Sequence, residues 1–296
     1  TGLILGHVLK IQVEGERLQR LARLLLFESG SKELAGKLNR TTDVSCSSQE
    51  DLIAFRYYIQ CVPEQVNAER IYFHSMSHED LALLRDILLC GNIRPAGSKS
   101  VRHTLSEQGN QEMKHLQETV GSMNEESRKQ WDLILNVSNT SLCDGECMSR
   151  CLSRESHQVR AFMIVMRGLP QRSLNRLVNR LEECKVTSLE IMDTDVHGFV
   201  THLAPLVSQS QEWLTLSTCR LVDADVADLI KILPVGHGLK RLIIDGNTFS
   251  LDAVKALSQH LQGLPELRLF WLEHEGPDAD RVKQVVRQNL PNVDFR

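Results

Sequence analysis

The stretch LKRLIIDGNTF, residues 239–249, decides the fold. Leu239, Leu242, Ile244, Asn247 and Phe249 fill the template L-x-x-L-x-L-x-x-N-x-L. Apolar residues two positions apart belong to a strand that buries one face. The asparagine slot is the turn after that strand, where we expect its side chain to bind backbone groups. The stretch therefore predicts a short strand followed by a tight turn.

The same pattern recurs on both sides of this stretch. It returns upstream in WLTLSTCRL (213–221), VTSLEIMDTDV (186–196) and VRAFMIVMRGL (159–169), with Cys219, Thr194 and Arg167 in the asparagine slot. It returns more weakly downstream in LPELRLFWL (264–272) and LPNVDF (290–295). The apolar positions we take as equivalent are Ile164, Ile191, Leu216, Ile244, Leu269 and Phe295. They recur about every 25–28 residues, inside the range of about 20–29 that leucine-rich repeats show.

Between the predicted strands the apolar spacing becomes helical. In LDAVKALSQHL (251–261) it follows one helix face, and Ser250 is a suitable N-cap. VADLIKIL (226–233) and SLNRLVNRL (173–181) behave alike. Stacked strand–turn–helix units build one continuous core. The sequence therefore predicts an α/β leucine-rich-repeat solenoid, with a curved parallel sheet inside and helices outside. A doubly wound α/β domain, which also alternates strand and helix, is the alternative.

The N-terminal segment, residues 1–65, differs from the rest. RLQRLARLLLFES (17–29) and SSQEDLIAFRYYIQCV (47–62) predict two helices, the second capped near Ser48 and ended by Pro63. We expect residues 1–65 to form a small helical segment that caps the solenoid. Residues 66–296 would then hold about eight repeats, of which those in 66–155 are degenerate. Their strands are expected near Phe73 and near Leu133 and Leu135.

Composition limits the classes of partner. Charged residues make up 24% of the chain and the net charge is −4, so no basic excess indicates nucleic acid. No apolar run approaches the roughly 20 residues of a membrane span. Eight cysteines in 296 residues favour free thiols in a reducing compartment, which predicts a cytoplasmic protein. Nothing in the sequence indicates an oligomeric state.

One cysteine cluster, CDGECMSRC, raises the question of a metal or redox site. Cys143, Cys147 and Cys151 are spaced by four and fall where the repeat expects a helix, so they would share one apolar face. Zinc sites usually add a second cysteine pair, and none is obvious here. The sequence also lacks H-E-x-x-H and G-x-S-x-G. We therefore expect no enzyme activity, no cofactor and no metal, and keep a metal or redox site at these cysteines as the alternative.

A protein-binding surface is expected on the concave face of the predicted sheet. Side chains between the buried leucines point away from the helices and stack in columns. These columns mix aromatic, apolar and charged groups, a composition typical of protein-binding surfaces. The predicted binding residues are Asp132, Met163, Glu190, Met192, Trp213, Thr215, Ser217, Ile243, Asp245, Arg268 and Phe270, with Val165 and Trp271 beside them.

The repeats resemble the ribonuclease-inhibitor class of leucine-rich repeats. The N-terminal part resembles the junction in NOD-like receptors where a helical domain ends and the repeats begin. The resemblance lies in RLLLFESGSKELAGKL followed by SSQEDLIAFRYYIQCVPEQVNAERIYFHSMS. Phe27-Glu28 matches a Phe-Glu or Tyr-Glu pair that the last helix of that domain carries. In that family a nucleotide-binding NACHT domain lies upstream. The resemblance implies a non-enzymatic, ligand-sensing or autoinhibitory module of a cytoplasmic innate-immune-type receptor. Its partner would be another protein or the upstream domains of the same parent chain. A free-standing inhibitor or adaptor resembling ribonuclease inhibitor is the alternative.

Overall fold

The structure is a computed structural model that describes residues 16–35, 43–62, 66–68, 70–73, 80, 83–84, 86–87, 93–95, 99–105, 109–123, 125–138, 159–273 and 278–296. The chain divides into two compact units. The first unit comprises Thr1–Ile134 with Gln158–Arg160, and the second comprises Leu135–His157 with Ala161–Arg296. Strand β6 (Trp131–Ser138) contains the boundary between them.

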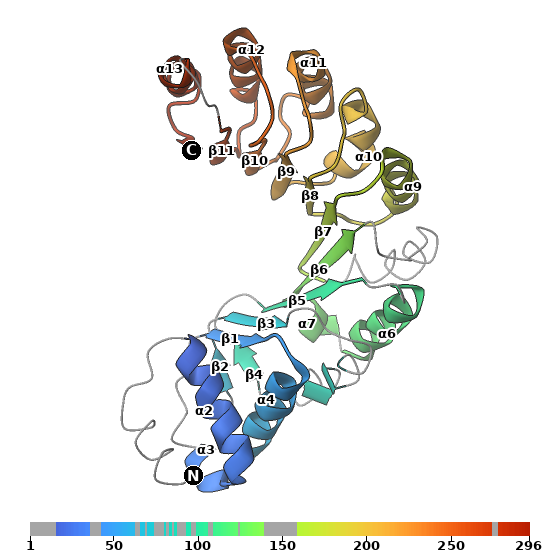
Figure 1. The fold of residues 1–296 in the computed structure, drawn as a ribbon, viewed down its shortest axis with the longest axis vertical. Coiled ribbons are helices and arrows are strands. Elements are labelled where there is room, and N and C mark those ends of the chain that lie inside the picture. Colours follow the sequence, from blue (N-terminus) through green and yellow to red (C-terminus); the bar gives the residue numbers. More distant parts are fainter. Residues whose placement is uncertain are drawn as a thin grey trace. The chain divides into compact units, whose positions relative to one another are not determined.

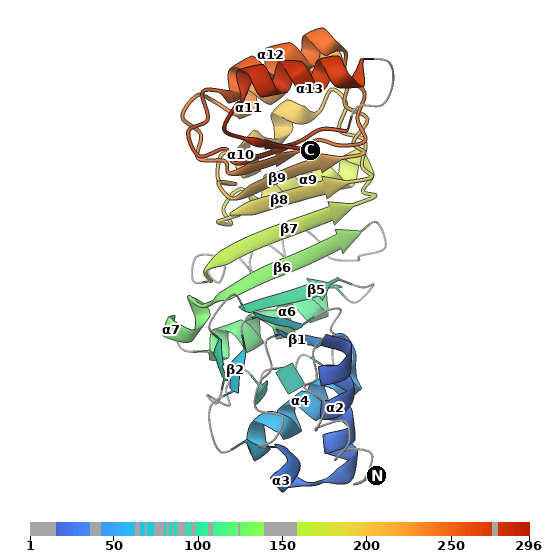
Figure 2. The same ribbon diagram turned by 90° about the vertical axis from the view of Figure 1, so that its left-hand side faces the viewer.

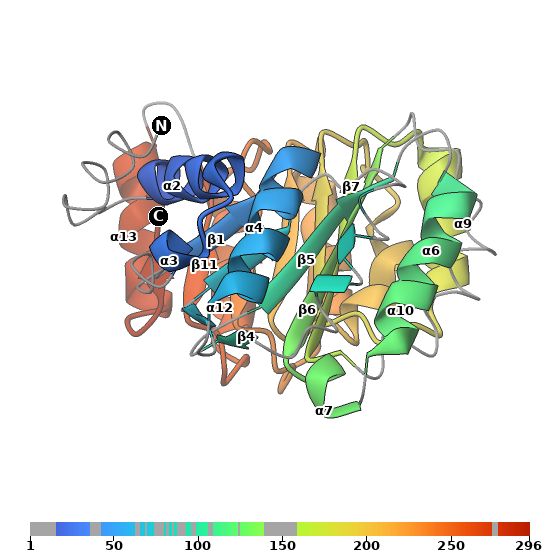
Figure 3. The same cartoon turned by 90° about the horizontal axis from the view of Figure 1, so that it is seen from below.

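The first unit combines a parallel sheet with helices. Strands β1 (Asp43–Cys46), β3 (Arg70–Phe73) and β5 (Lys99–Thr104) pair in parallel, and a separate pair is formed by β2 (Val66–Ala68) and β4 (Ile93–Pro95). Helices α2 (Glu16–Ser29) and α4 (Gln49–Cys61) lie side by side (Figure 3). The shorter α3 (Lys32–Ala35), α6 (Gly109–Ser122) and α7 (Glu125–Arg128) are further helices of this unit.

A buried carboxylate ties α2 to α4. Ser48 caps α4 by accepting a hydrogen bond from the Asp51 N–H at 3.3 Å, as the sequence predicted. Asp51 in turn accepts from Arg20 Nε of α2 at 2.5 Å and from the Ser47 N–H at 3.1 Å. Burial alone would raise the pKa of Asp51, but these hydrogen bonds outweigh it and the pKa is lowered. The two predicted helices of the N-terminal segment are thus confirmed.

The N-terminal segment is not purely helical, which corrects one expectation. Strand β1 lies inside residues 1–65 and pairs with β3, so this segment contributes a strand to the sheet. Val44 and Cys46, two positions apart, are fully buried and explain why DVSC forms a strand. The stretch is too short to show a period in the sequence. In the region predicted to hold degenerate repeats, β3 and β6 lie at the two places where strands were expected, near Phe73 and near Leu133 and Leu135.

The second unit carries its strands in chain order. Strands β7 (Ala161–Arg167), β8 (Ser188–Met192), β9 (Trp213–Ser217), β10 (Arg241–Ile243), β11 (Leu269–Trp271) and β12 (Asp294–Phe295) are all parallel neighbours. Figure 2 shows β7, β8 and β9 side by side with arrows in one direction. The order runs without the reversal that a doubly wound sheet would show. A parallel α/β architecture is therefore confirmed.

The described helices of this unit lie on one side of its sheet (Figure 1). They are α9 (Gln171–Leu181), the 3₁₀ turn η3 (Val200–Leu203) continued by α10 (Ala204–Val207), α11 (Asp223–Ile232), α12 (Leu251–Leu261) and α13 (Ala279–Asn289). Ser250 caps α12 by accepting from the Ala253 N–H, and Gly236 and Gly263 follow the ends of α11 and α12. The three helices predicted over residues 173–261 are confirmed.

The core of the second unit lies between this helix layer and the sheet. Leu174, Val178 and Leu181 of α9 are fully buried at helical spacing, and Leu189 and Leu214 are fully buried in the strands. Burying one such side chain stabilises the fold by about 1.5–3 kcal/mol. None of the described helices is long and apolar enough to cross a membrane.

Candidate functional site

The sheet of the second unit presents one face that no described helix covers, and we call it the open face. Leu189, Ile191, Leu214 and Leu216 are fully buried toward the helices, so the residues between them point to the opposite side. The strand register sets these residues in rows across neighbouring strands. The rows are Met163–Ser188–Trp213–Arg241–Leu269–Asp294, Val165–Glu190–Thr215–Ile243–Trp271 and Arg167–Met192–Ser217.

Most of the predicted binding residues lie on the open face or at its border. The rows contain Met163, Glu190, Met192, Trp213, Thr215, Ser217 and Ile243. Asp245 follows β10 and accepts a hydrogen bond from the Ser217 hydroxyl, while Arg268 directly precedes β11. Asp132 is on β6 in the first unit, where it binds Arg160 through Nε at 2.8 Å and also through Nη2. The described strand registers do not include β6, so the position of Asp132 among the predicted binding residues stays a prediction.

Phe270 is a correction, because its side chain lies in the core. It is fully buried, pairs with core-facing Leu242, and packs on Phe295 with ring centroids 5.6 Å apart. The sequence aligned Ile244 with Leu269, whereas the register sets Leu269 beside Arg241. The difference is an odd number of positions, which reverses the side chains that face the core. Leu267, which resembled a strand position, is buried in the turn before β11.

The register of β7 is a second correction. The sequence aligned Ile164 with Ile191, whereas the register sets Ile164 beside Leu189. Met163 consequently lies beside Ser188 instead of Glu190. Because the difference is an even number of positions, Met163 stays on the open face and only its neighbours change.

The corrected register also changes which residue after β7 corresponds to the asparagine of the template. Arg167 pairs with Met192, so the residue that corresponds to Thr194 is Leu169 and not Arg167. The Leu169 N–H donates to Thr194 Oγ1 at 3.1 Å, and the Leu169 side chain is buried. An apolar residue therefore fills this slot in the turn after β7.

Asn247 holds the turn after β10, as the template predicted. Its Oδ1 accepts hydrogen bonds from the N–H groups of Cys219 and Leu221, both at 3.0 Å. Its Nδ2 donates to the carbonyls of Leu216 at 2.7 Å and Ile244 at 2.9 Å. One side chain therefore satisfies backbone groups of two successive strands.

The same slot is filled differently in the two preceding turns. Cys219 Sγ lies 3.3 Å from the carbonyl oxygens of Ile191 and Ser217. Thr194 Oγ1 donates to the Met192 carbonyl at 2.8 Å and accepts from the Leu169 N–H at 3.1 Å. Each substitute keeps part of the bonding that asparagine provides, so the turns preserve their geometry despite different residues.

A left-handed backbone residue follows each strand from β7 to β10. Gly168, Asp193, Thr218 and Gly246 have φ angles of 62°, 49°, 53° and 65°. The N–H groups of Gly168, Asp193 and Thr218 donate to carbonyls of the next strand or turn at 2.9–3.1 Å. The conformation costs little at glycine and more at threonine, whose β-branched side chain disfavours positive φ. The positive φ therefore recurs after each of these strands whether the residue there is glycine, aspartate or threonine.

Within the second unit, ion pairs connect neighbouring strand–turn–helix segments near the ends of their strands. Arg167 Nε lies 2.7 Å from Asp193, Arg220 lies 3.3 Å from Asp195, and Lys240 Nζ lies 2.5 Å from Glu212. These pairs are solvent-exposed, and each contributes about 0–1 kcal/mol. They neutralise charges that stand beside the open face.

On the helix side of the sheet, a buried carboxylate joins the segment that follows β8 to the segment that follows β9. Asp225 of α11 is 1% exposed and accepts from the N–H groups of Gly198 and Val222 and from His197 Nδ1, each at 2.9 Å. Burial acts to raise the pKa of Asp225, but the hydrogen bonds prevail and the pKa is lowered. The hydrogen bond to Asp225 raises the pKa of His197.

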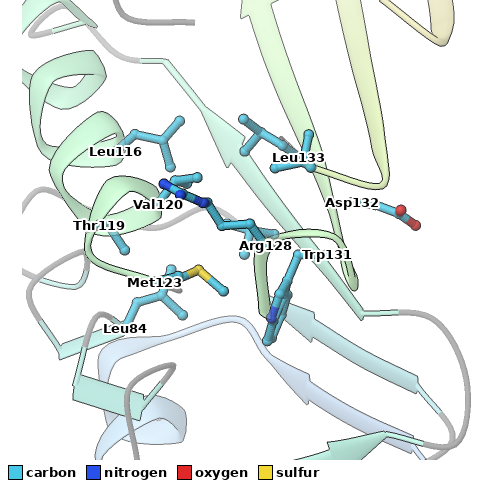
Figure 4. A pocket seen from close by; sticks show the side chains of 11 residues that line it. Leu84, Leu116, Thr119, Val120, Met123, Arg128, Trp131, Asp132 and Leu133 are labelled. Carbon is cyan, nitrogen blue, oxygen red and sulfur yellow. The ribbon is translucent and has the colours of Figure 1, made fainter. Parts of the chain in front are cut away.

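The first unit contains a small apolar cavity with a volume of about 10 Å³, barely the space that one water molecule needs (Figure 4). Leu84, Leu116, Met123 and Trp131 contribute to a lining whose polar members are Thr119, Arg128 and Asp132. Asp132 is already bonded to Arg160, and the Thr119 hydroxyl donates to the His115 carbonyl. The cavity is thus a small packing gap in the core, too small for a ligand.

The comparisons with known proteins show no family. No family model matches the sequence, and no curated protein matches it either. Among solved structures, the chain is similar to a complex of Rad7 and Elc1 from yeast, with 12% sequence identity and a TM-score of 0.45. The similarity covers 100% of this chain and 78% of that chain.

No metal-binding cluster of three or more His, Cys, Asp or Glu residues occurs within the described ranges. Cys143, Cys147 and Cys151 lie outside these ranges, so the predicted alternative of a metal or redox site there stays a prediction. Burial raises the pKa values of the Cys46, Cys184 and Cys219 thiols to about 12. At neutral pH these three thiols are therefore protonated and unreactive.

Proposed function

We propose that this chain is a leucine-rich-repeat module that binds a protein partner through the open face. The observation that carries the proposal is the group formed by Trp213, Ile243 and Trp271 on three neighbouring strands. Trp271 is 39% exposed and Trp213 is partly exposed, although both sit on paired strands beside a complete core. Rigid aromatic side chains on a surface are the residues that most often dominate protein interfaces.

Several features support the leucine-rich-repeat class. The strands of the second unit follow chain order at intervals of about 25–28 residues, and the described helices between them lie on one side. Asn247, Cys219 and Thr194 occupy one structural position in successive turns and bind backbone groups there. Repeats of this class stack into a solenoid, and the open face would be its concave side.

The class of parent protein rests on the resemblance at Phe27-Glu28. We propose that the module is the ligand-sensing or autoinhibitory part of a cytoplasmic, innate-immune-type receptor of the NOD-like class. Its partner would then be a protein ligand or the upstream domains of the same parent chain. Binding to the open face would favour either the inactive or the active state of that receptor. No catalytic activity is assigned to the module.

The coding sequence upstream of Thr1 tests this parentage. A G-x-x-x-x-G-K-[ST] motif in the preceding several hundred residues would support a nucleotide-binding receptor. An initiator methionine directly before Thr1 would instead support the alternative, a free-standing inhibitor or adaptor resembling ribonuclease inhibitor. Both outcomes leave the binding role of the open face standing.

Site-specific photocrosslinking tests the binding role itself. Benzoylphenylalanine replaces Trp271 on the open face in one variant and exposed Gln259 on the outer side of α12 in the control. The full-length protein is irradiated in the cells that produce it, and crosslinked products are identified by mass spectrometry. We expect one defined product, another protein or an upstream part of the parent chain, from position 271 and not from 259. Equal products from both positions, or none from 271, would refute the proposal.

A further inference from the structure

Arg241 is an exposed cation on the open face, at the start of β10. Its guanidinium carbon lies 5.1 Å from the centroid of the Trp213 ring, and the two residues are register partners on β10 and β9. Stacking on an indole holds the plane of the guanidinium and is favourable for the cation. The group is therefore held in place before any partner arrives.

The other charged residues near Arg241 already have partners. Lys240 binds Glu212, Arg296 lies 3.0 Å from Asp294, and Arg268 lies 3.9 Å from Glu266. Arg241 contacts no carboxylate of the described residues. A guanidinium presents five N–H donors in a planar fork that suits one carboxylate through two parallel hydrogen bonds. Arg241 thus supplies a site for one negative group.

Apolar and polar groups beside Arg241 complete this surface. Ile243 is two positions further along β10, and Trp271 is its register partner on β11. Thr215, on the other side of Ile243, is 5% exposed, and its Oγ1 has no hydrogen-bond partner among the described residues. A buried hydroxyl without a partner costs free energy, which an incoming peptide group would recover.

We propose that the open face recognises an acidic, apolar segment of its protein partner. This inference rests on the proposed function and specifies the partner's chemistry. A carboxylate of Asp or Glu binds the Arg241 guanidinium, and a neighbouring large apolar side chain packs on Ile243 and Trp271. A nucleic acid fits less well, because a chain of phosphates needs several free cations, whereas Lys240, Arg268 and Arg296 are already paired with carboxylates.

Selection from a phage-displayed library of random dodecapeptides tests the inference on the whole chain. We expect wild-type protein to enrich peptides in which Asp or Glu stands next to Trp, Phe or Leu. Arg241→Glu should lower their affinity at least about tenfold, because it removes a charge-assisted pair and adds repulsion. Arg287→Glu on α13 is the same charge reversal on an exposed residue that has no ion pair among the described residues, and it should change affinity less than about twofold. A selection repeated on Arg241→Glu should enrich Lys or Arg instead.

The outcomes separate this inference from the proposed function. Peptides that lose binding with Trp271→Ala but show no acidic enrichment, or that tolerate Arg241→Glu, would overturn the acidic segment and leave the open face as a binding surface. A failure to select any peptide sensitive to Trp271→Ala or Arg241→Glu would count against both. Circular dichroism melting should show unchanged stability in Arg241→Glu, Trp271→Ala and Arg287→Glu, since all three replaced side chains are exposed. RNA or DNA bound more tightly than the acidic peptides would also overturn the inference.

Discussion

Replacing Asn247 by alanine should strongly destabilise the second unit. The side chain joins the turn after β10 to the turn after β9 through hydrogen bonds with Cys219, Leu221, Leu216 and Ile244. Alanine leaves two N–H groups and two carbonyls without these partners. Water reaches the half-buried turn only partly, so most of the bonding is lost rather than exchanged.

The magnitude follows from these four hydrogen bonds. Each contributes about 0.5–1.5 kcal/mol net, and partial hydration of the turn reduces the sum, so we expect a loss of about 3 kcal/mol in the free energy of unfolding. Asn247→Asp keeps the acceptor for Cys219 and Leu221 but loses both donors. Its second carboxylate oxygen would face the carbonyl oxygens of Leu216 and Ile244 and be repelled by them, so its cost should be at least comparable to that of the alanine variant.

Urea denaturation of the full chain, followed by tryptophan fluorescence, measures the change. Hydrogen exchange of the Cys219 and Leu221 amides supplies a local readout, and both should exchange faster in Asn247→Ala. Asn175→Ala is the control, because Asn175 accepts from Asn179 at 3.3 Å on the surface of α9; it should change stability by less than about 0.5 kcal/mol. A loss below about 1 kcal/mol in Asn247→Ala, with exchange unchanged, would refute the role assigned to this side chain.

Three other substitutions test the same unit. Phe270→Ala should cost about 3–5 kcal/mol in urea denaturation and Trp271→Ala less than about 1 kcal/mol, and equal costs would contradict the corrected register. Thr218→Gly should raise the melting temperature by relieving positive φ, with a gain of up to about 1 kcal/mol; a lower melting temperature would contradict the strain. His197→Ala should destabilise more at about pH 6 than at about pH 8.5. The raised pKa of His197 means that its contribution is complete below the unfolded value near 6.5 and is lost as pH rises through the folded value; equal destabilisation at both pH values would contradict it.

The α/β class and most elements of the second unit could be predicted from the sequence, because core residues there follow clear periods. The spacing of Leu174, Val178 and Leu181 fits a helix and not a strand, and Ser250 marks the start of α12. The turn slot at Asn247 was equally clear, since an asparagine in that position has a defined bonding role. These features depend on local chemistry that a single sequence displays.

Register across the sheet was predicted less well, because it depends on loops. A shift of two positions keeps every side chain of AFMIVMR on the same face, so alternation fits Met163 beside either Ser188 or Glu190. RLFWL offers apolar residues at every position from Leu269 to Leu272, and only packing against Phe295 shows that Phe270 faces the core. The position of Arg241 on Trp213 also needed the register of β9 and β10, and no residue pattern indicates it.

The unequal intervals between strands have a consequence for how such a chain changes over time. Register partners stand closer along the chain from β8 to β9, as Leu189 and Leu214 do, than from β9 to β10, as Leu214 and Leu242 do. The extra residues are taken up on the helix side, where Val235 is 74% exposed in the loop after α11. Insertions and deletions on that side can therefore accumulate while the opposite surface keeps its spacing.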